Sequence, residues 1–472
     1  MDGSDSGGVT CVLTSVWITV GYTIDEIGVI PGDANSRAMD LNGLDLPIFG
    51  YQAVGTSDGH ALLWEHRDTP PPYLLDLERD YCEGAPISSA LGINNMSPSW
   101  VVGFHSFGGP DQPSPVIYRD TGCAPPQCTL LPTWKTDRPP GKYGQAWAVN
   151  DAGTIAGWVD RVASRWTNDS GVWQVESLGT LGGPTSAATR INQSGTIVGR
   201  SDTAGGVEHA FVWTSSAGMQ DIHSGPGTSA AHGVNAYDEV VGELSPGGQP
   251  ANAFRWTPTT PMQVLPGLPG SLGGSATAIN DFGVVVGRSD IGGPRAVYWP
   301  ASDQPAFSLT AQLLSNPGWD LASAESINNR GQIVGYGTNP AGQTRGFLLT
   351  PVKVPILNER CTFRHVPPIP VPIPRPSPIE LDGGGLVLTA DRRITYARPP
   401  RSNPLPAPVS PSDVRGLMQL AFAGRTETNI EQVAAMVHDI VDCESRSLFE
   451  ALAREGDGGP DTAWGGREHQ PE

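Results

Sequence analysis

The sequence is poor in charge, and above all in cationic charge. Charged residues make up 16% of the chain, and 29 Lys and Arg stand against 48 Asp and Glu, for a formal net charge of −19. Binding to nucleic acid or to an anionic membrane surface depends on clustered Lys and Arg. We therefore expect no nucleic-acid partner and no association with an anionic membrane surface.

Long hydrophobic runs are also missing. The longest apolar candidate, Cys11–Val20, is shorter than a transmembrane helix and carries hydroxyl residues, so we expect no membrane insertion. The start of the chain, MDGSDSGG, lacks the basic region of a signal peptide. Residues 11–20 could be the remains of an export signal if the start is misplaced, or could simply form a first strand.

Metal and cofactor signatures are absent from the sequence. Six cysteines occur, but none forms a Cys-x-x-Cys pair, and only Cys123 and Cys128 are close together. A disulfide between these two is one interpretation, with Cys82 or Cys11 as competing partners, and free thiols are the other. The sequence also has no phosphate-binding loop, no His-Glu-x-x-His motif and no dinucleotide-binding glycine motif between a strand and a helix. We therefore predict no cofactor, no metal site and no catalytic residue.

Glycine and proline are abundant instead. The 59 Gly and 45 Pro make up about a fifth of the chain, which is typical of many short strands joined by turns. Ser186–Trp213 and Ser275–Trp299 share one order of features: small residues, Ile-Asn, a glycine turn, Val-Gly, Arg-Ser-Asp, Gly-Gly and an aromatic end. The repeated asparagines are Asn42, Asn94, Asn150, Asn192, Asn235, Asn280 and Asn328. The repeated glycines downstream of them are Gly55, Gly103, Gly157, Gly199, Gly242, Gly287 and Gly335.

The spacing of this repeat indicates a β-propeller. Successive asparagines are separated by about 42 to 56 residues, the range of propeller blades. Unit six shows four candidate strands, at 262–265, 275–279, 284–289 and 295–299, with a hairpin turn at Asn280–Gly283. Seven units predict an all-β fold, a seven-bladed β-propeller of four-stranded blades at residues 22–351. Residues 1–21 would be an N-terminal segment or a strand that closes the ring.

The repeats resemble the HAF-repeat family of probable extracellular repeat proteins, named for the motif His-Ala-Phe. The motif occurs at 209–211, with variants at 60–62, 252–254 and 345–347. Residues 177–183 look like the family's Leu-Gly-Thr-Leu-Gly-Gly element, which is echoed at 269–274. Units two and three depart from the pattern, because they are longer, lack this element and carry cysteines. The resemblance implies secretion but no known activity.

The composition changes after the repeats. Residues 352–411 are a proline-rich linker, in which Pro367–Pro378 has the pattern of a polyproline II spacer or of a ligand for an aromatic groove. We expect a small hairpin around Asp382–Gly385. Residues 412–455 predict a small helical module, with a capping box at Thr428 and Glu431. Such a module is too small to bury much surface alone, so we expect it to anchor or oligomerise the protein. Residues 456–472 are acidic and glycine-rich, and we expect a disordered tail.

Several repeated residues suggest chemistry that their context argues against. Gly55–Gly59 satisfies Gly-x-Ser-x-Gly, but a nucleophilic serine needs a strand-to-helix turn and Ser57 lies between strands. His60 and His209 occupy a strand position that other residue types occupy in other units, which favours packing or hydrogen bonding. The repeated asparagines could bind calcium or, at Asn192, carry a glycan, but we favour bonding to backbone groups at the blade turns.

Tryptophan offers the best candidate binding residues, because indole rings suit carbohydrate or peptide stacking. Five of the thirteen tryptophans close blade strands and are expected in the core, namely Trp64, Trp166, Trp213, Trp256 and Trp299. Outside the closing strands, units two to four hold Trp100, Trp134, Trp147 and Trp158, which we predict as a binding edge.

The sequence thus favours a non-catalytic, exported binding or scaffolding propeller for a protein or carbohydrate partner. A rigid ring would hold variable segments, such as Asp120–Tyr143, in fixed geometry. One alternative is a propeller lyase or hydrolase with its site at the central channel, because one fold can host many chemistries. Another is a cytoplasmic adaptor, which the missing signal peptide and the polyproline run would suit. The expected location is extracellular or at the cell surface.

Overall fold

The computed structural model describes most of the repeat region and parts of the flanking chain. The described residues are 9–43, 52–65, 73–77, 87–96, 99–106, 113–119, 127–134, 143–300, 304–316, 318–363, 385–388 and 394–397. The chain forms two compact units, Gly21–Val352 and a second unit made of Met1–Val20 and Lys353–Glu472. Among the described residues, no helix is long and apolar enough to cross a membrane.

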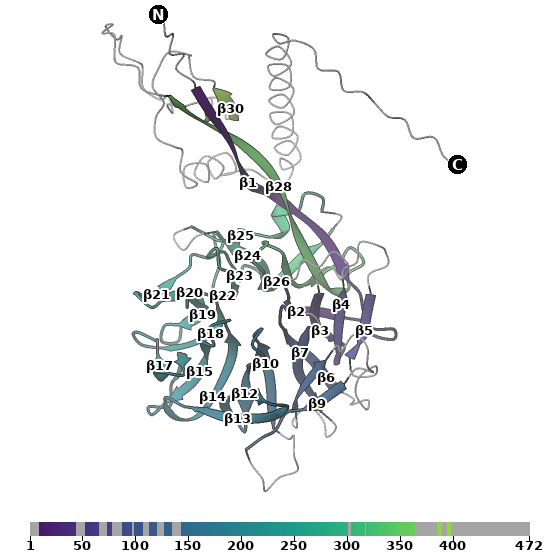
Figure 1. Cartoon of the computed structure of the whole chain (residues 1–472), viewed down its shortest axis with the longest axis vertical. Helices are drawn as coiled ribbons and strands as arrows, with labels where there is room; N and C mark the ends of the chain where they lie inside the picture. Colours follow the sequence, from purple (N-terminus) through teal and green to yellow (C-terminus); the bar gives the residue numbers. More distant parts are fainter. Residues whose placement is uncertain are drawn as a thin grey trace, which may run out of the picture. The chain divides into compact units, whose positions relative to one another are not determined.

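Seven four-stranded antiparallel sheets form the blades of a propeller (Figure 1). Blade 1 contains β2 (Ser36–Leu41), β3 (Gln52–Ser57), β4 (His60–Glu65) and β5 (Tyr73–Asp76). Blade 2 contains β6 (Ile87–Ile93), β7 (Trp100–Ser106), β8 (Ser114–Arg119) and β9 (Gln127–Leu130). Blade 3 contains β10 (Gly144–Val149), β11 (Ile155–Val159), β12 (Val162–Asp169) and β13 (Val172–Gly179).

The remaining blades follow in chain order. Blade 4 contains β14 (Gly182–Ile191), β15 (Ile197–Thr203), β16 (Glu208–Thr214) and β17 (Gly218–Asp221). Blade 5 contains β18 (Thr228–Val234), β19 (Val240–Ser245), β20 (Asn252–Thr257) and β21 (Thr260–Val264). Blade 6 contains β22 (Gly274–Ile279), β23 (Val285–Asp290), β24 (Pro294–Trp299) and β25 (Phe307–Ser308), after which comes the short 3-10 helix η1 (Thr310–Gln312). Blade 7 contains β26 (Asp320–Ile327), β27 (Ile333–Thr338), β28 (Thr344–Phe363) and β1 (Val9–Ile27). The predicted seven-bladed propeller of four-stranded blades is confirmed.

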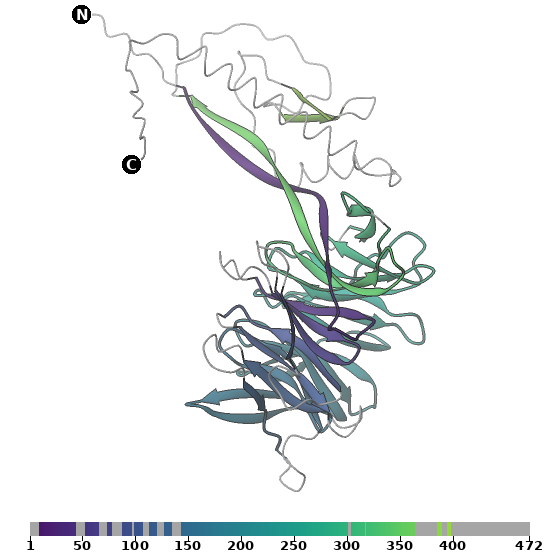
Figure 2. The same ribbon diagram turned by 90° about the vertical axis from the view of Figure 1, so that its right-hand side faces the viewer.

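The first strand closes the ring. β1 pairs with β28 and completes blade 7 as its fourth strand, so the N-terminal residues do contribute a closing strand. The two strands lie side by side in both views (Figure 1, Figure 2). The innermost strand of each blade contacts that of the next blade, and β26 contacts β2 in the same way. The ring is therefore continuous, with its two ends held in one sheet.

One strand assignment from the sequence is wrong. Residues 262–265 were expected in unit six, but β21 pairs with β20 and is the outermost strand of blade 5. The turn explains this placement, because Thr257 and Thr260 are partners across a short hairpin that returns the chain along β20. The fourth strand of blade 6 is instead β25, which follows β24. Each blade therefore begins at its innermost strand.

Each blade brings an alanine on its innermost strand against the repeated glycine on its second strand. In blade 4, Ala188 pairs with Gly199, and a β-bulge follows at Thr189. A Cβ on Gly199 would lie only 2.0 Å from the carbonyl oxygen of Ala187. At the other repeated glycines, an added Cβ would lie 1.9 to 2.1 Å from a carbonyl oxygen of the innermost strand. The paired alanines of the other blades are Ala38, Ala90, Ala146, Ala231, Ala276 and Ala324. This close approach explains why the repeat requires glycine.

The repeated asparagines of blades 2 to 7 tie each of these blades to the next. In blade 4, Oδ1 of Asn192 accepts the N–H of Thr196 at 2.9 Å, and its Nδ2 donates to the carbonyl oxygen of Asn235 in blade 5 at 2.9 Å. The same inter-blade bond leaves blades 2, 3, 5, 6 and 7, and the last runs from Asn328 to the carbonyl oxygen of Asn42. All seven asparagines are buried. Their engaged side chains support the backbone role over calcium or glycan binding.

The His-Ala-Phe motif supplies packing and a further inter-blade bond. Phe211 is fully buried and packs among residues of blades 3 and 4 that include Leu178. The N–H of Ala210 donates to Oγ of Ser229 on the innermost strand of blade 5, at 2.9 Å. Equivalent bonds join Ala61 to Ser88 and Ala163 to Ser186. Of the tryptophans expected in the core, Trp64, Trp166, Trp213 and Trp299 are buried, whereas Trp256 is half-buried.

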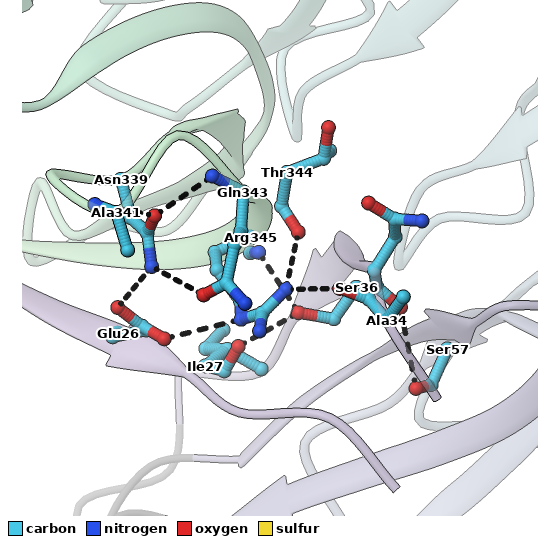
Figure 3. Close-up of polar contacts among 12 residues, drawn as sticks. Glu26, Ile27, Ala34, Ser36, Ser57, Asn339, Ala341, Gln343, Thr344 and Arg345 are labelled. Carbon is cyan, nitrogen blue, oxygen red and sulfur yellow. Dashed lines mark hydrogen bonds and ion pairs between the residues drawn. The ribbon is translucent and has the colours of Figure 1, made fainter. Parts of the chain in front are cut away.

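A polar cluster around Arg345 joins blade 7 to blade 1 (Figure 3). Arg345 is only 6% exposed, and its Nε lies 3.2 Å from Oε1 of Glu26 on β1. Its Nη1 donates to the carbonyl oxygens of Thr344 and Ala34. Ser36 accepts the N–H of Gly346 and donates to the carbonyl oxygen of Ile27. These contacts join the closing strand, the last repeat and the first repeat.

Several predicted segments outside the propeller lie beyond the described residues. These are the polyproline stretch 367–378, the helical module 412–455 and the tail 456–472. The described hairpin consists of β29 (Gly385–Leu388) and β30 (Ile394–Ala397). Its turn therefore follows β29, whereas the sequence placed the turn at Asp382–Gly385.

The close alanine–glycine contact predicts a large penalty for a single methyl group. We expect Gly199→Ala to lower the free energy of unfolding by about 1 to 3 kcal/mol, because the added Cβ would overlap the backbone of β14. Gly205→Ala in the same blade is the control, since its Cβ would make only one ordinary contact, at 3.7 Å. Urea unfolding would measure both, and equal stability of the two variants would contradict this packing account.

The Arg345 cluster predicts a second stability difference. We expect Arg345→Gln to lower the free energy of unfolding by about 1 to 3 kcal/mol, because the buried guanidinium that bonds Glu26, Ala34 and Thr344 is lost. Arg295 occupies the equivalent position in blade 6 and pairs with Asp320 in a more exposed setting. Arg295→Gln should therefore cost less than about 1 kcal/mol. A similar loss in both variants, measured by denaturant unfolding, would refute a special role for the Arg345 cluster in closure.

Candidate functional site

The four predicted binding tryptophans separate into two pairs. Trp100 and Trp134 pack against the hydrophobic cluster between blades 2 and 3, and Trp100 makes an edge-to-face contact with Trp173 at 5.9 Å. Trp147 and Trp158 instead line a cavity of about 330 Å³ between blades 3 and 4. The cavity is therefore the candidate functional site, and Trp100 and Trp134 contribute to packing.

Both blades contribute to the walls of this cavity. Blade 3 supplies two positions on β10, one on β11 and one in the turn that follows β11; blade 4 supplies positions on β14, β15 and β16. The lining residues are Gln145, Trp147, Trp158, Arg161, Thr185, Ser186, Ala187, Arg200, Ser201 and Glu208. The volume is at the lower end of the range for small-ligand pockets.

The two indoles are fixed by a common acceptor. Nε1 of Trp147 donates to Oε1 of Gln145 at 2.7 Å, and Nε1 of Trp158 donates to the same oxygen at 3.3 Å. Both side chains are half-buried. Because the indole N–H groups are already bonded, each ring offers its apolar face, rather than a donor, to anything that enters the cavity.

The charged lining residues are mostly cationic. Arg200 is paired with Glu208 at 3.5 Å, and their side chains are 46% and 37% exposed. Arg161 is exposed in the turn after β11, where it and Asp160 both have positive φ. Within the described residues, no acidic side chain is paired with the Arg161 guanidinium. The cavity thus offers positive charge in a chain of net charge −19.

The repeat explains why these positions are open. In all seven blades, the residue after the repeated glycine is half-buried or exposed, whereas the glycine and the residue before it are buried. These open residues are Thr56, Phe104, Trp158, Arg200, Glu243, Arg288 and Tyr336. The bulged positions on the innermost strands are Met39, Leu91, Trp147, Thr189, His232, Thr277 and Glu325. The repeat therefore varies at the positions that face outward.

Sequence reasoning missed the polar residues of the cavity. It singled out Trp147 and Trp158 but not Gln145, Arg161 or Arg200. A signal for Arg200 was present, because the residue after the repeated glycine varies among the units, with six residue types in seven units. No comparable signal marks Arg161, since its place beside blade 4 depends on the turn after β11 and on the packing of two blades.

The serine of the apparent nucleophile motif is a structural residue. Ser57 is fully buried, accepts the N–H of Ile30 at 3.1 Å and donates to the carbonyl oxygen of Asn35. Ser201 and Ser289, at the equivalent positions, accept backbone N–H groups from Leu181 and Leu268. Each of these serines holds the segment that leads into its own blade. The geometry agrees with the rejection of a catalytic Ser57.

The histidines of the motif form hydrogen bonds near the blade edges. Nδ1 of His60 lies 3.0 Å from Asp33, and this hydrogen bond raises the pKa of His60 above its ordinary value. His209 bonds Asp221 at 2.8 Å and stacks on His223, with ring centroids 4.2 Å apart. Partial burial, together with the neighbouring His209, lowers the pKa of His223.

One cysteine side chain lies among those that the structure describes. It belongs to Cys128, on β9, which is disulfide-bonded. Cys123, one of its candidate partners from the sequence, lies outside the described residues, as does Cys82, and the side chain of Cys11 is likewise not described. A disulfide at this blade is typical of proteins from oxidising compartments.

Comparison with known proteins identifies no family. No protein-family model matches the chain. No curated protein sequence matches it either. Among solved structures, similar chains include YCF48 bound to D1 peptide, which has 14% sequence identity and a TM-score of 0.43 and aligns over 70% of this chain and 95% of that chain.

Two further solved structures are similar over an equal share of the chain. TolB from Acinetobacter baumannii has 14% identity and a TM-score of 0.32, covering 70% of this chain and 68% of TolB. The WD40 β-propeller domain of Doa1 has 11% identity and a TM-score of 0.30, and the alignment covers 70% of this chain and 96% of the Doa1 chain. The propeller architecture of the present chain follows from its own sheet topology.

The two perturbed histidines predict opposite dependences of stability on pH. His223, with its lowered pKa, resists protonation in the folded state, so it should reduce stability as the pH falls below about 6.5. His60, with its raised pKa, should add stability below about 6.5 and lose that contribution as the pH rises through its folded pKa. Titration by imidazole NMR, assigned with His60→Gln and His223→Gln, should place the two midpoints on opposite sides of 6.5; the reverse order would contradict the described contacts.

Proposed function

We propose that the chain is a non-catalytic binding propeller that presents the cavity between blades 3 and 4 to a protein or carbohydrate partner. The observation that carries this proposal is the combination of two indole faces with unneutralised cationic charge in one cavity. Aromatic faces and a few polar groups in a concave site are the usual composition of a binding pocket.

Each repeat has buried residues that hold the backbone and more exposed residues that vary, and this separation supports a binding function rather than a catalytic one. The asparagine, the glycine and the paired alanine are buried and hold the backbone, whereas the residue after the glycine is half-buried or exposed and varies among the blades, with arginine in two of them. In blade 5, the two positions equivalent to Trp147 and Trp158 hold His232 and Glu243, which lie 3.8 Å apart. One backbone frame therefore presents different side chains around the ring.

We also propose that the protein is exported and related to the HAF-repeat family. The His-Ala-Phe motif at 209–211 and its variants support the family relation, and the disulfide-bonded Cys128 supports an oxidising location. The predicted helical module at 412–455 would anchor or oligomerise the propeller.

Substitution of the cavity tryptophans tests the proposed function. Arrays of glycans and peptides would be probed with the full-length chain and with the double variant Trp147→Ala, Trp158→Ala. We expect the double variant to lose binding at least about tenfold, because truncated anchor residues typically cost more than 1 kcal/mol. Thermal unfolding would verify that the variant remains folded.

The matched control uses exposed aromatic residues elsewhere on the propeller. Tyr237 and Phe282 are 69% and 75% exposed, in the turns that follow the repeated asparagines of blades 5 and 6. The double variant Tyr237→Ser, Phe282→Ser should bind like the original protein. If that variant loses binding and the tryptophan variant does not, the cavity is not the binding site.

A further inference from the structure

We propose that the cavity between blades 3 and 4 binds a carboxylate-bearing sugar ring, such as a hexuronate unit of an acidic oligosaccharide. This inference rests on the proposed function and names the ligand class for the same site. The lining residues supply two apolar ring faces and an excess of hydrogen-bond donors. A pyranose carboxylate needs both features at once.

The hydroxyl groups of the cavity are already committed to the protein. Thr185 donates to Asp202 at 2.6 Å, and Ser186 donates to the carbonyl oxygen of Gly179 while accepting the N–H of Ala163. Ser201 accepts the N–H of Leu181. These side chains shape the wall, and recognition of a polar ligand falls to the other lining groups.

Apart from the Glu208 carboxylate, the polar groups that remain open are donors. Arg161 is exposed and, in the part of the chain that is described, has no carboxylate partner. The ion pair of Arg200 with Glu208, at 3.5 Å, leaves much of its guanidinium exposed. The amide Nε2 of Gln145 makes no hydrogen bond among the described residues, because its Oε1 alone serves the two indoles. Guanidinium groups match a carboxylate in charge and geometry.

The indoles provide the apolar half of the site. Their N–H groups point to Gln145, so their faces are the available surface. A pyranose ring has one apolar C–H face that can lie on such an aromatic ring, with its hydroxyl and carboxylate oxygens directed outward. The cations beside Trp158 would then meet those oxygens. A ligand of phosphate alone would leave the indole faces unused.

The size of the cavity and the strands that carry Trp158 and Arg200 favour a sugar over an extended peptide. β11, which carries Trp158, is paired with β10 and β12, and β15, which carries Arg200, is paired with β14 and β16, whereas β10 and β14 are the innermost strands of their sheets. A peptide therefore cannot add as another strand along β11 or β15, which is a common mode of backbone recognition. The cavity of about 330 Å³ suits one compact ring better than an extended chain.

Calorimetry with paired ligands tests this inference. The probes are oligogalacturonate and oligoglucuronate, the same oligosaccharides after reduction of their carboxylates to alcohols, and an Asp/Glu-rich decapeptide. We expect at least one acidic oligosaccharide to bind about tenfold more tightly than its neutral counterpart, with an affinity that falls as salt rises. Arg161→Gln and Arg200→Gln should each remove most of that preference.

Arg288→Gln is the matched control, because Arg288 follows the repeated glycine of blade 6 and is likewise exposed. It should leave the preference unchanged. Equal binding of acidic and neutral oligosaccharides, binding of the peptide alone, or no saccharide binding at millimolar concentration would each overturn the acidic-sugar assignment while leaving a binding propeller intact. The proposed function itself fails if the tryptophan double variant binds every array partner as well as the original protein.

Discussion

In every blade, the innermost strand approaches the second strand so closely that only glycine fits opposite its alanine. The bulge after that alanine places a carbonyl oxygen about 2 Å from where a Cβ of the glycine would lie. Because the approach recurs in all seven blades, the same bend is repeated around the ring. In blades 2 to 7, the asparagine at the end of the innermost strand then reaches the next blade, and Asn328 of blade 7 bonds to Asn42 of blade 1. The contacts of Arg345 with β1 hold the closure from the outer side.

This frame separates residues that hold the backbone from residues that face outward. The position after the glycine carries Trp158 in blade 3 and Arg200 in blade 4, and these two side chains meet across one cavity. At this position, blade 3 thus contributes an aromatic side chain to the cavity and blade 4 contributes a cationic one. The net charge of −19 makes a cationic cavity a selective feature, because the rest of the chain disfavours anions. The side chains that line a cavity between two blades therefore depend on which repeats are adjacent.

The seven blades were predictable because the same backbone geometry demands the same residues each time. Asn42 to Asn328 and Gly55 to Gly335 mark every blade, even though the strands around them differ. The residue at which each blade begins was harder to predict. Residues 262–265 look like a strand whether they are assigned to blade 5 or to blade 6, and only their pairing with β20 places them in blade 5. Two of the four predicted binding tryptophans line the cavity, whereas Trp100 packs against Trp173. Arg161 was not predictable, because its contribution arises from two blades that pack together and not from a local pattern.

A paired alanine scan through the seven blades tests the separation of frame and binding surface most directly. In each blade, one variant would replace the repeated glycine and a second would replace the residue after it, and both unfolding and ligand binding would be measured. The account predicts that the glycine variants lose stability in all blades, by about 1 to 3 kcal/mol. It also predicts that the neighbouring variants change binding only in blades 3 and 4. Binding losses spread evenly around the ring, or stability losses confined to the outward-facing positions, would contradict it.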